Sequence, residues 1–204
     1  MIKALLFDFG RVISAQKPKS LFDRYESRLK LLPGTLNTIM FESPFWKKAL
    51  YGEIDMPAYW QAIGPQLNLY TPAAVQAFHK RYYLDEKINP DVFELLKLLI
   101  NHYQLAVVSN HPPGLKQWLK EWDIHWLFEQ VVCSGDEGVA KPDPAIFYLA
   151  LQRLRITAQE AVFIDDTQEY VIAAQGAGMR ALLFTTAEKL RHELADLGVF
   201  REIV

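Results

Sequence analysis

Residues 162–179 read VFIDDTQEYVIAAQGAGM, an apolar run that ends in two adjacent aspartates and continues into a helix-like segment and a glycine turn. Apolar, β-branched runs of this length are typical of buried parallel strands. In open α/β sheets, ligands bind beyond the carboxyl ends of the strands. The stretch therefore predicts a strand that delivers Asp165 and Asp166 to a ligand site.

Three other segments deliver polar groups in the same way. LLFD ends at Asp8, LAVVS ends at Ser109 with Asn110 behind it, and QVVC leads through a loop to Lys141. The carboxyl ends of parallel strands meet at one edge of a sheet, so we expect these groups to converge. Carboxylates, a hydroxyl and an ammonium in one crevice favour a metal-dependent site for a phosphorylated substrate.

Strand and helix patterns alternate from residue 89 onward, which predicts an α/β fold with a doubly wound, Rossmann-like parallel sheet. After a first strand over 2–8, we expect strands over 104–109, 130–133, 161–165 and 180–184. We expect helices over 90–102, 113–122, 144–154, 168–176 and 188–197.

The segment between the first two strands has helical patterns only, with Pro57 suited to the first turn of a helix. We therefore expect an α/β core made of residues 1–15 and 86–204, and an inserted all-helical cap at 16–85. The insertion is rich in aromatic residues, and their helical spacing favours the interior of the cap over the lining of a pocket. These residues are Trp46, Tyr51, Tyr59 and Trp60.

The composition of the chain argues against nucleic acid and membranes as binding partners. The 204 residues carry 22 basic and 24 acidic side chains, and the absence of a Lys/Arg block argues against nucleic acid. No run approaches the about 18 apolar residues of a membrane span, and the N-terminal apolar stretch is too short for a signal peptide. Cys133 is the single cysteine, which excludes an internal disulfide. We expect no membrane partner and a cytoplasmic location.

The ordered set Asp8, VVSN (107–110), GVAKPDPAIF (138–147) and VFIDD (162–166) resembles the haloacid dehalogenase-like (HAD) hydrolase superfamily. The match spans nearly the whole chain, and the helical insertion fits the C1 cap of subfamily I. GEIDMPAYW at 52–60 also resembles the cap segment of phosphatases in this group. The resemblance implies a HAD-like core with a helical cap.

The resemblance also implies a phosphatase mechanism. Asp8 would attack phosphorus and form an aspartyl-phosphate, which water would then hydrolyse. Lys141 would neutralise charge on Asp8 and the phosphate, and Ser109 with Asn110 would hold the phosphoryl oxygens. The substrate would be a small phosphorylated metabolite, with a sugar phosphate as one candidate.

A magnesium ion completes the set of groups that the resemblance implies. Asp8, Asp166 and the Gly10 carbonyl would bind Mg²⁺, with Asp165 beside them. Three carboxylates and one lysine would repel a phosphate dianion, so a divalent cation makes substrate binding plausible.

Gly10 departs from the pattern of most phosphatases in the superfamily, which carry a second aspartate at this position. That aspartate protonates the leaving group, and such general acid–base catalysis is typically worth about 10²–10⁴-fold. Epoxide-hydrolase-like and sugar-phosphate phosphatase relatives look similar here, with a DLG-type motif, so loss of activity does not follow. Arg11 and His111 are the nearest groups that could compensate, and neither receives a catalytic assignment from the sequence.

The same residues are compatible with other functions. An impaired member that binds a phosphorylated ligand without turnover is one alternative, motivated by Gly10. A haloacid dehalogenase is less favoured, because the adjacent carboxylates at 165 and 166 suit a metal site better than a metal-free one. Motif order argues firmly against a receiver-type phosphoacceptor domain, because the acidic pair of such domains follows the first strand and here it follows the fourth. Pairing of the caps into a homodimer stays open.

Overall fold

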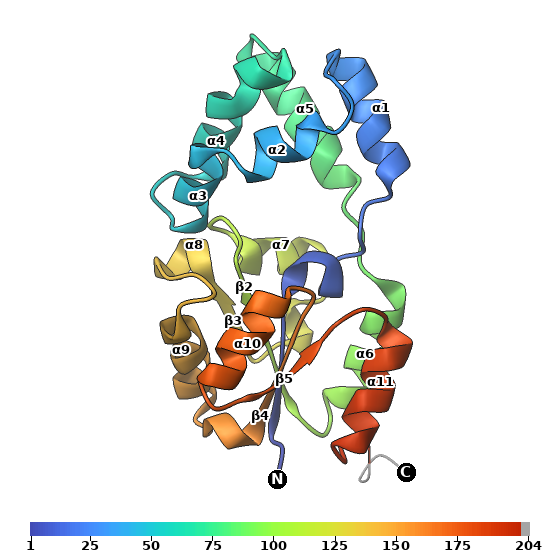
Figure 1. Cartoon of the computed structure of the whole chain (residues 1–204), viewed down its shortest axis with the longest axis vertical. Coiled ribbons are helices and arrows are strands. Elements are labelled where there is room, and N and C mark those ends of the chain that lie inside the picture. The colour runs from blue at the N-terminus through green and yellow to red at the C-terminus, as the bar shows by residue number, and fades with distance from the viewer. Residues whose placement is uncertain (201–204) are drawn as a thin grey trace.

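A five-stranded parallel sheet forms the centre of the larger body of the molecule (Figure 1). The computed structural model describes residues 1–200. The strand order is β3-β2-β1-β4-β5, and every neighbouring pair is parallel. The strands are β1 (Ala4–Phe7), β2 (Gln104–Ser109), β3 (Gln130–Cys133), β4 (Ala161–Asp165) and β5 (Arg180–Leu183). The predicted doubly wound α/β sheet is confirmed.

Helices cover both faces of this sheet. Side chains alternate along β1, so that Leu5 and Phe7 join one hydrophobic cluster and Ala4 and Leu6 join another. The first cluster includes residues of α6 (Pro90–Leu99), α7 (Leu115–Glu121) and α11 (Ala187–Asp196). The second includes residues of α9 (Pro144–Leu154) and α10 (Gln168–Gly176). Burial on both faces explains why the central strands are apolar throughout.

Several predicted element boundaries coincide with those observed, and two helices are shorter than predicted. The predicted strands at 104–109, 130–133 and 161–165 match β2, β3 and β4. The helix predicted over 113–122 begins only at Leu115, because Gly114 has φ 103°, a left-handed conformation outside the helical region. The short helix α8 (Ser134–Glu137) was not predicted.

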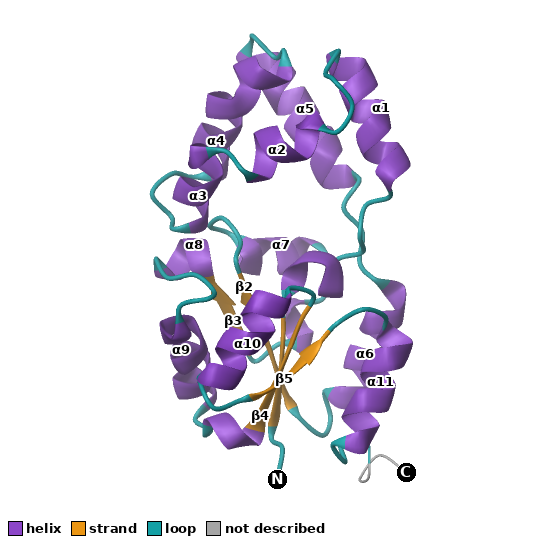
Figure 2. Cartoon of the chain, viewed as in Figure 1, coloured by secondary structure: helices purple, strands orange, loops and turns teal. Residues whose placement is uncertain are grey.

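A second body of helices lies over the carboxyl edge of the sheet, and we call it the cap (Figure 2). Polar side chains begin three of its helices by accepting a backbone N–H bond: Ser43 from Trp46, Asp55 from Ala58 and Thr71 from Ala74. Each of these helices has a proline in its first turn. The cap helices are α1 (Lys19–Leu29), α2 (Thr35–Phe41), α3 (Pro44–Leu50), α4 (Met56–Ile63) and α5 (Pro72–Leu84).

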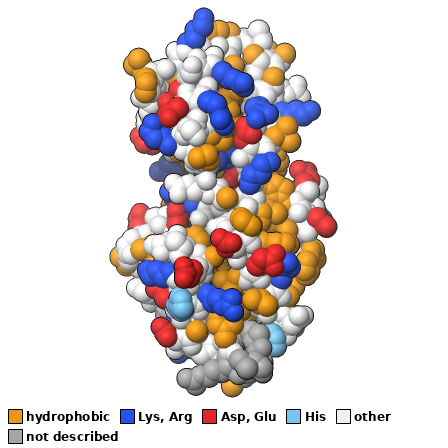
Figure 3. Space-filling model, turned by 90° about the vertical axis from the view of Figure 1, so that its right-hand side faces the viewer, with side chains coloured by type: hydrophobic (Ala, Val, Ile, Leu, Met, Phe, Trp, Pro, Cys, Tyr) orange, Lys and Arg blue, Asp and Glu red, His pale blue; other side chains and the backbone are white. Residues whose placement is uncertain are grey.

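The cap has its own hydrophobic cluster and a charged outer surface. Tyr59 and Trp60 lie at the centre of this cluster, which is separate from the two clusters of the core. On the face shown in Figure 3, Lys and Arg side chains gather over the cap. Among residues 1–200, no helix is both long enough and apolar enough to cross a membrane.

Two segments of the chain connect the cap to the core, and they are hydrogen-bonded to each other. The Ala15 N–H donates to the Lys87 carbonyl at 2.7 Å, and the Asn89 N–H donates to the Ile13 carbonyl at 2.8 Å. They flank an antiparallel bridge between residues 14 and 88. The domain limits expected at residues 15/16 and 85/86 stay a prediction, and residues 201–204 of the predicted core lie outside the described part.

Candidate active site

The candidate site lies where the central strands end beneath the cap. Asp8 follows β1, Ser109 ends β2 and Asp165 ends β4, so three neighbouring strands deliver these groups to one edge. Asp8 and Ser109 line a cleft that is also lined by cap residues. The structure therefore brings together the strand-end groups that the sequence singled out.

Lys141 connects two of the strand ends through buried ion pairs. Its Nζ lies 2.7 Å from Asp8 Oδ1 and 2.5 Å from Asp165 Oδ2, and its side chain is only 1% exposed. Burial alone would lower the pKa of Lys141, but the two carboxylates together raise it above its ordinary value. The lysine is therefore a fixed positive charge beside Asp8.

Asp165 is the most deeply buried carboxylate of the site. Burial raises its pKa to about 6, against the opposing effect of Lys141. The Thr167 N–H donates to its Oδ1 at 2.8 Å while Lys141 contacts Oδ2. Both oxygens are thus engaged, which fixes the orientation of the carboxylate.

The amide of Asn110 holds the loop that carries Lys141. Asn110 Nδ2 donates to the Lys141 carbonyl at 2.8 Å, and the Lys141 N–H donates to Asn110 Oδ1 at 2.7 Å. The ring of Tyr170, with its centroid 4.9 Å from the Lys141 Nζ, adds a cation–π contact. Sequence reasoning missed Tyr170, which lies one helical turn after the acidic pair in DDTQEY. The geometry gives Asn110 a positioning role toward Lys141.

Asp166 is paired with Arg11, a partner that the sequence did not indicate. The Arg11 Nε lies 2.7 Å from Asp166 Oδ2 and Nη2 donates to Oδ1 at 3.3 Å. Thr167 Oγ1 also donates to Oδ1, at 3.2 Å. Burial raises the pKa of Asp166, and Arg11 acts against this shift. Because these partners are 155 residues apart, only the fold reveals the pair.

The three carboxylates of the site are close enough to share one cation. Oxygens of Asp8, Asp165 and Asp166 lie within 4.8 Å of one another. Hard carboxylate oxygens are the donors that Mg²⁺ prefers. The negative charges outnumber Lys141 and Arg11 by one, so the donor set fits a divalent cation.

Position 10 could accommodate a side chain. Gly10 has φ −67° and ψ 125°, a conformation open to any L-residue. A Cβ atom built there would lie 3.7 Å from Asp8 Oδ2, an ordinary contact, with no other atom that close. Neither the backbone nor packing among the described residues therefore requires glycine beside the strand end.

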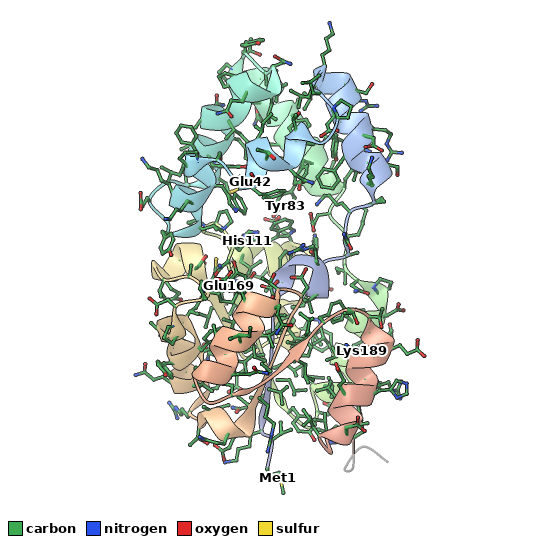
Figure 4. All side chains as sticks on the ribbon, viewed as in Figure 1. Met1, Glu42, Tyr83, His111, Glu169 and Lys189 are labelled. Atoms are coloured by element: carbon green, nitrogen blue, oxygen red, sulfur yellow. The ribbon has the colours of Figure 1, made fainter. Side chains whose placement is uncertain are left out.

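His111 lies at the top of the core, beneath Tyr83 of the cap (Figure 4). Its Nδ1 lies 2.7 Å from the Pro112 carbonyl, which favours the tautomer that carries the proton on Nδ1. The ring makes edge contacts with Phe9 and Trp118. Burial lowers the pKa of His111, so its neutral form predominates at neutral pH.

The cleft above these groups has a volume of about 550 Å³ and is shared between cap and core. Trp46, Tyr59 and Trp60 line it, and Tyr59 and Trp60 also belong to the buried cluster of the cap. From the sequence, packing inside the cap and lining a pocket are alternative roles for these rings. In the structure, Tyr59 and Trp60 have both roles. Tyr51 is 38% exposed and lies outside the lining.

A family model for haloacid dehalogenase-like hydrolases matches residues 10–178. The chain belongs to this family. The resemblance inferred from the motifs is confirmed, and the chain is a HAD-like hydrolase.

Two curated relatives align with this HAD-like hydrolase over most of their lengths. The sesquiterpene phosphatase astK of Aspergillus oryzae is 29% identical, over 96% of this chain and 96% of its own. A glyceraldehyde 3-phosphate phosphatase of Methanopyrus kandleri is 30% identical, over 88% of this chain and 82% of its own.

A solved structure shares the fold of this HAD-like hydrolase. The HAD family enzyme bt-2542 of Bacteroides thetaiotaomicron superposes with a TM-score of 0.75 at 20% identity, covering 95% of this chain and 98% of its own. The same enzyme has been crystallised in complex with magnesium and inorganic phosphate, and that structure has a TM-score of 0.72.

Proposed function

We propose that this protein is a Mg²⁺-dependent phosphomonoesterase in which Asp8 is the nucleophile. The observation that carries this proposal is the buried Asp8–Lys141–Asp165 ion cluster at the strand ends, with Asp166 close enough to share a cation. The names of both relatives as phosphatases, and the magnesium and phosphate bound by the structural neighbour, support it.

Asp8 acts first in the proposed reaction. Its carboxylate attacks phosphorus, a bond forms between Asp8 and the phosphoryl group, and the ester P–O bond breaks; the leaving alkoxide takes a proton from solvent water and departs as the alcohol. Lys141 stabilises the negative charge of the transferring group, and the Ser109 hydroxyl binds a phosphoryl oxygen. Asn110 contributes through the lysine loop that it holds. Water then hydrolyses the aspartyl-phosphate and regenerates Asp8.

The residues proposed to hold Mg²⁺ are Asp8, Asp166 and the Gly10 carbonyl, with Asp165 beside them. When bound, Mg²⁺ supplies positive charge to the phosphoryl oxygens. Arg11 would orient Asp166 through its ion pair. The proposed substrate class is a small phosphorylated metabolite, with sugar phosphates as the first candidates suggested by the motifs.

Hydrolysis of p-nitrophenyl phosphate tests this proposal. We expect activity that needs Mg²⁺, is lost in EDTA and disappears in Asp8→Asn, which keeps the size of the side chain. Asp196→Asn, at an exposed position of α11, is the matched control and should behave as wild type. Wild-type rates in Asp8→Asn would remove Asp8 as the nucleophile.

Two other functions predict different results in the same assay. A binding protein without turnover would bind inorganic phosphate, measured by calorimetry, and release none from any ester. A dehalogenase would release chloride from 2-chloropropionate without metal, although three carboxylates close together would repel that carboxylate substrate. A cytoplasmic location and a homodimer stay predictions; light scattering measures the oligomeric state.

A further inference from the structure

Aromatic rings line the cleft in an unbroken series from the nucleophile into the cap. Each ring contacts the next, with centroids between 4.0 and 5.9 Å apart. We call this series the aromatic wall, and its members are Phe9, Trp118, Tyr83, His79, Trp60 and Tyr59. Its first member follows Asp8 directly in the sequence. Asp8 and the six rings line the same cleft, so a group esterified to a phosphate on Asp8 would lie in a cleft with an aromatic lining.

The wall is built by both bodies of the protein. Phe9 and Trp118 belong to the core, whereas Tyr83, His79 and Trp60 belong to the cap. The junction is the Tyr83–Trp118 stack, with a centroid distance of 4.0 Å and an interplanar angle of 21°. Aromatic surface thus continues across the boundary between the two bodies.

Away from the strand ends, the charged side chains that line the cleft form an ion pair with each other. Lys17 forms a largely buried ion pair with Glu86, and its Nζ lies 4.3 Å from the centroid of the Tyr82 ring. Burial lowers the pKa of Lys17 to about 8, despite the attraction of Asp85. Sugar recognition needs polar groups that are free to bond hydroxyls, because a buried hydroxyl without a partner is costly. This ion pair does not offer them, and away from the strand ends Gln16 and Asn37 are the amide side chains of the lining, few beside the aromatic rings.

We propose that the physiological substrate is the phosphate monoester of a bulky apolar alcohol, whose apolar part lies along the aromatic wall. This inference rests on the proposed phosphatase function and replaces sugar phosphates as the preferred substrates. The cleft volume of about 550 Å³ lies within the range of roughly 300–1,000 Å³ found for drug-sized ligands. Ring faces bind both aromatic and branched aliphatic groups, because both remove apolar surface from water.

A substrate panel under identical Mg²⁺ conditions tests the inference. The panel contains 1-naphthylmethyl phosphate, geranyl phosphate, glucose 6-phosphate and glyceraldehyde 3-phosphate, all esters of alkanols rather than phenols, with phosphate release as the readout. We expect kcat/KM for the better apolar ester to exceed that for either sugar phosphate by at least about tenfold, a plausible size for apolar discrimination. The two apolar esters distinguish an aromatic from an isoprenoid alcohol.

The outcomes separate this inference from the function on which it rests. Preference for a sugar phosphate would overturn the inference and leave the phosphatase intact. Hydrolysis of no ester, p-nitrophenyl phosphate included, would overturn both.

A variant of the wall gives a second test. In Tyr83→Leu, we expect the ratio of kcat/KM for 1-naphthylmethyl phosphate to kcat/KM for methyl phosphate to fall by about tenfold, since a stacked ring is lost. Tyr83→Phe should restore the ratio. Tyr148→Leu, at a position 53% exposed on α9, should leave the ratio at its wild-type value. The ratio corrects for partial unfolding, and an unchanged ratio in Tyr83→Leu would overturn the inference.

Discussion

The core and the cap contribute differently to the same cleft: the charged groups at the strand ends come from the core, whereas four of the six rings of the aromatic wall come from the cap. The core contributes charged side chains that are buried and paired, with Lys141 held between Asp8 and Asp165. The cap contributes the rings of Tyr83, His79, Trp60 and Tyr59, which lie in successive contact along the cleft. We therefore expect chemistry and selectivity to be separable in this chain. Changes at the charged groups of the core should alter the rate with every substrate. Changes in the cap should alter the choice among substrates or the stability of the cap.

Removing the central cation of the core should have the largest effect. Lys141→Met leaves Asp8 and Asp165 facing each other without a counter-charge, and we expect kcat to fall by about 10²–10³-fold. The free energy of unfolding, measured by urea denaturation in EDTA, should fall by about 3–5 kcal/mol, as for other broken buried ion pairs. Lys189→Met, half exposed on α11, is the control. A near-normal kcat in Lys141→Met would contradict a charge-dependent core.

A carboxylate placed at position 10 should raise the rate. The conformation and surroundings of Gly10 admit a side chain beside Asp8, and general acid–base catalysis is worth about 10²–10⁴-fold. We expect Gly10→Asp to raise kcat on an ester with a poor leaving group by about 10²-fold, at the low end of that range. Gly10→Asn, of similar shape but unable to transfer a proton, should not. Equal rates in the two variants would show that another group already supplies the proton.

Acid should weaken metal binding by a smaller factor. The pKa of Asp165 is raised to about 6, so its ionised form is lost as the pH falls through 6 rather than near 4. Because metal binding competes with protonation, Mg²⁺ affinity by calorimetry should be about fourfold lower at pH 5.5 than at pH 7.5. A constant affinity over this interval would show that Asp165 does not influence the metal.

The smallest effect on catalysis should come from the interior of the cap. The buried Glu26 of α1 accepts backbone N–H bonds from Gly34 and Leu36, at 2.8 and 2.9 Å. Glu26→Ala leaves those donors without a partner and should cost about 1–3 kcal/mol of unfolding free energy. Turnover of p-nitrophenyl phosphate should stay within about twofold, a change of less than 0.5 kcal/mol in activation free energy. Glu94→Ala, exposed on α6, is the matched control.

The core could be predicted well because its signals are local. Each central strand is an apolar run that ends at the polar residue it delivers, as β4 does at Asp165. Parallel strands place such ends at one edge whatever the loops between them do. The convergence of Asp8, Ser109 and Asp165 therefore followed from the order of the chain.

The partners of these groups could not be predicted, because they depend on distances across the fold. No residue near Arg11 in the sequence indicates that its side chain forms an ion pair with Asp166. The hydrogen bonds between the Asn110 amide and the Lys141 backbone likewise depend on how the loop folds. The same holds for the cap. Helical spacing predicts that Trp60 is buried, but a ring can be buried and still line a cleft on its other side.

The stacked pair Tyr83–Trp118 has an optical consequence. Trp118 belongs to the core and Tyr83 to the cap, so any separation of the two bodies removes a phenol ring from one face of an indole. Indole emission responds to the polarity and quenching groups around the ring. The protein thus carries an intrinsic fluorophore at the boundary between its two bodies, and a variant that keeps Trp118 as its sole tryptophan would let stopped-flow fluorescence follow their relative motion without an added label.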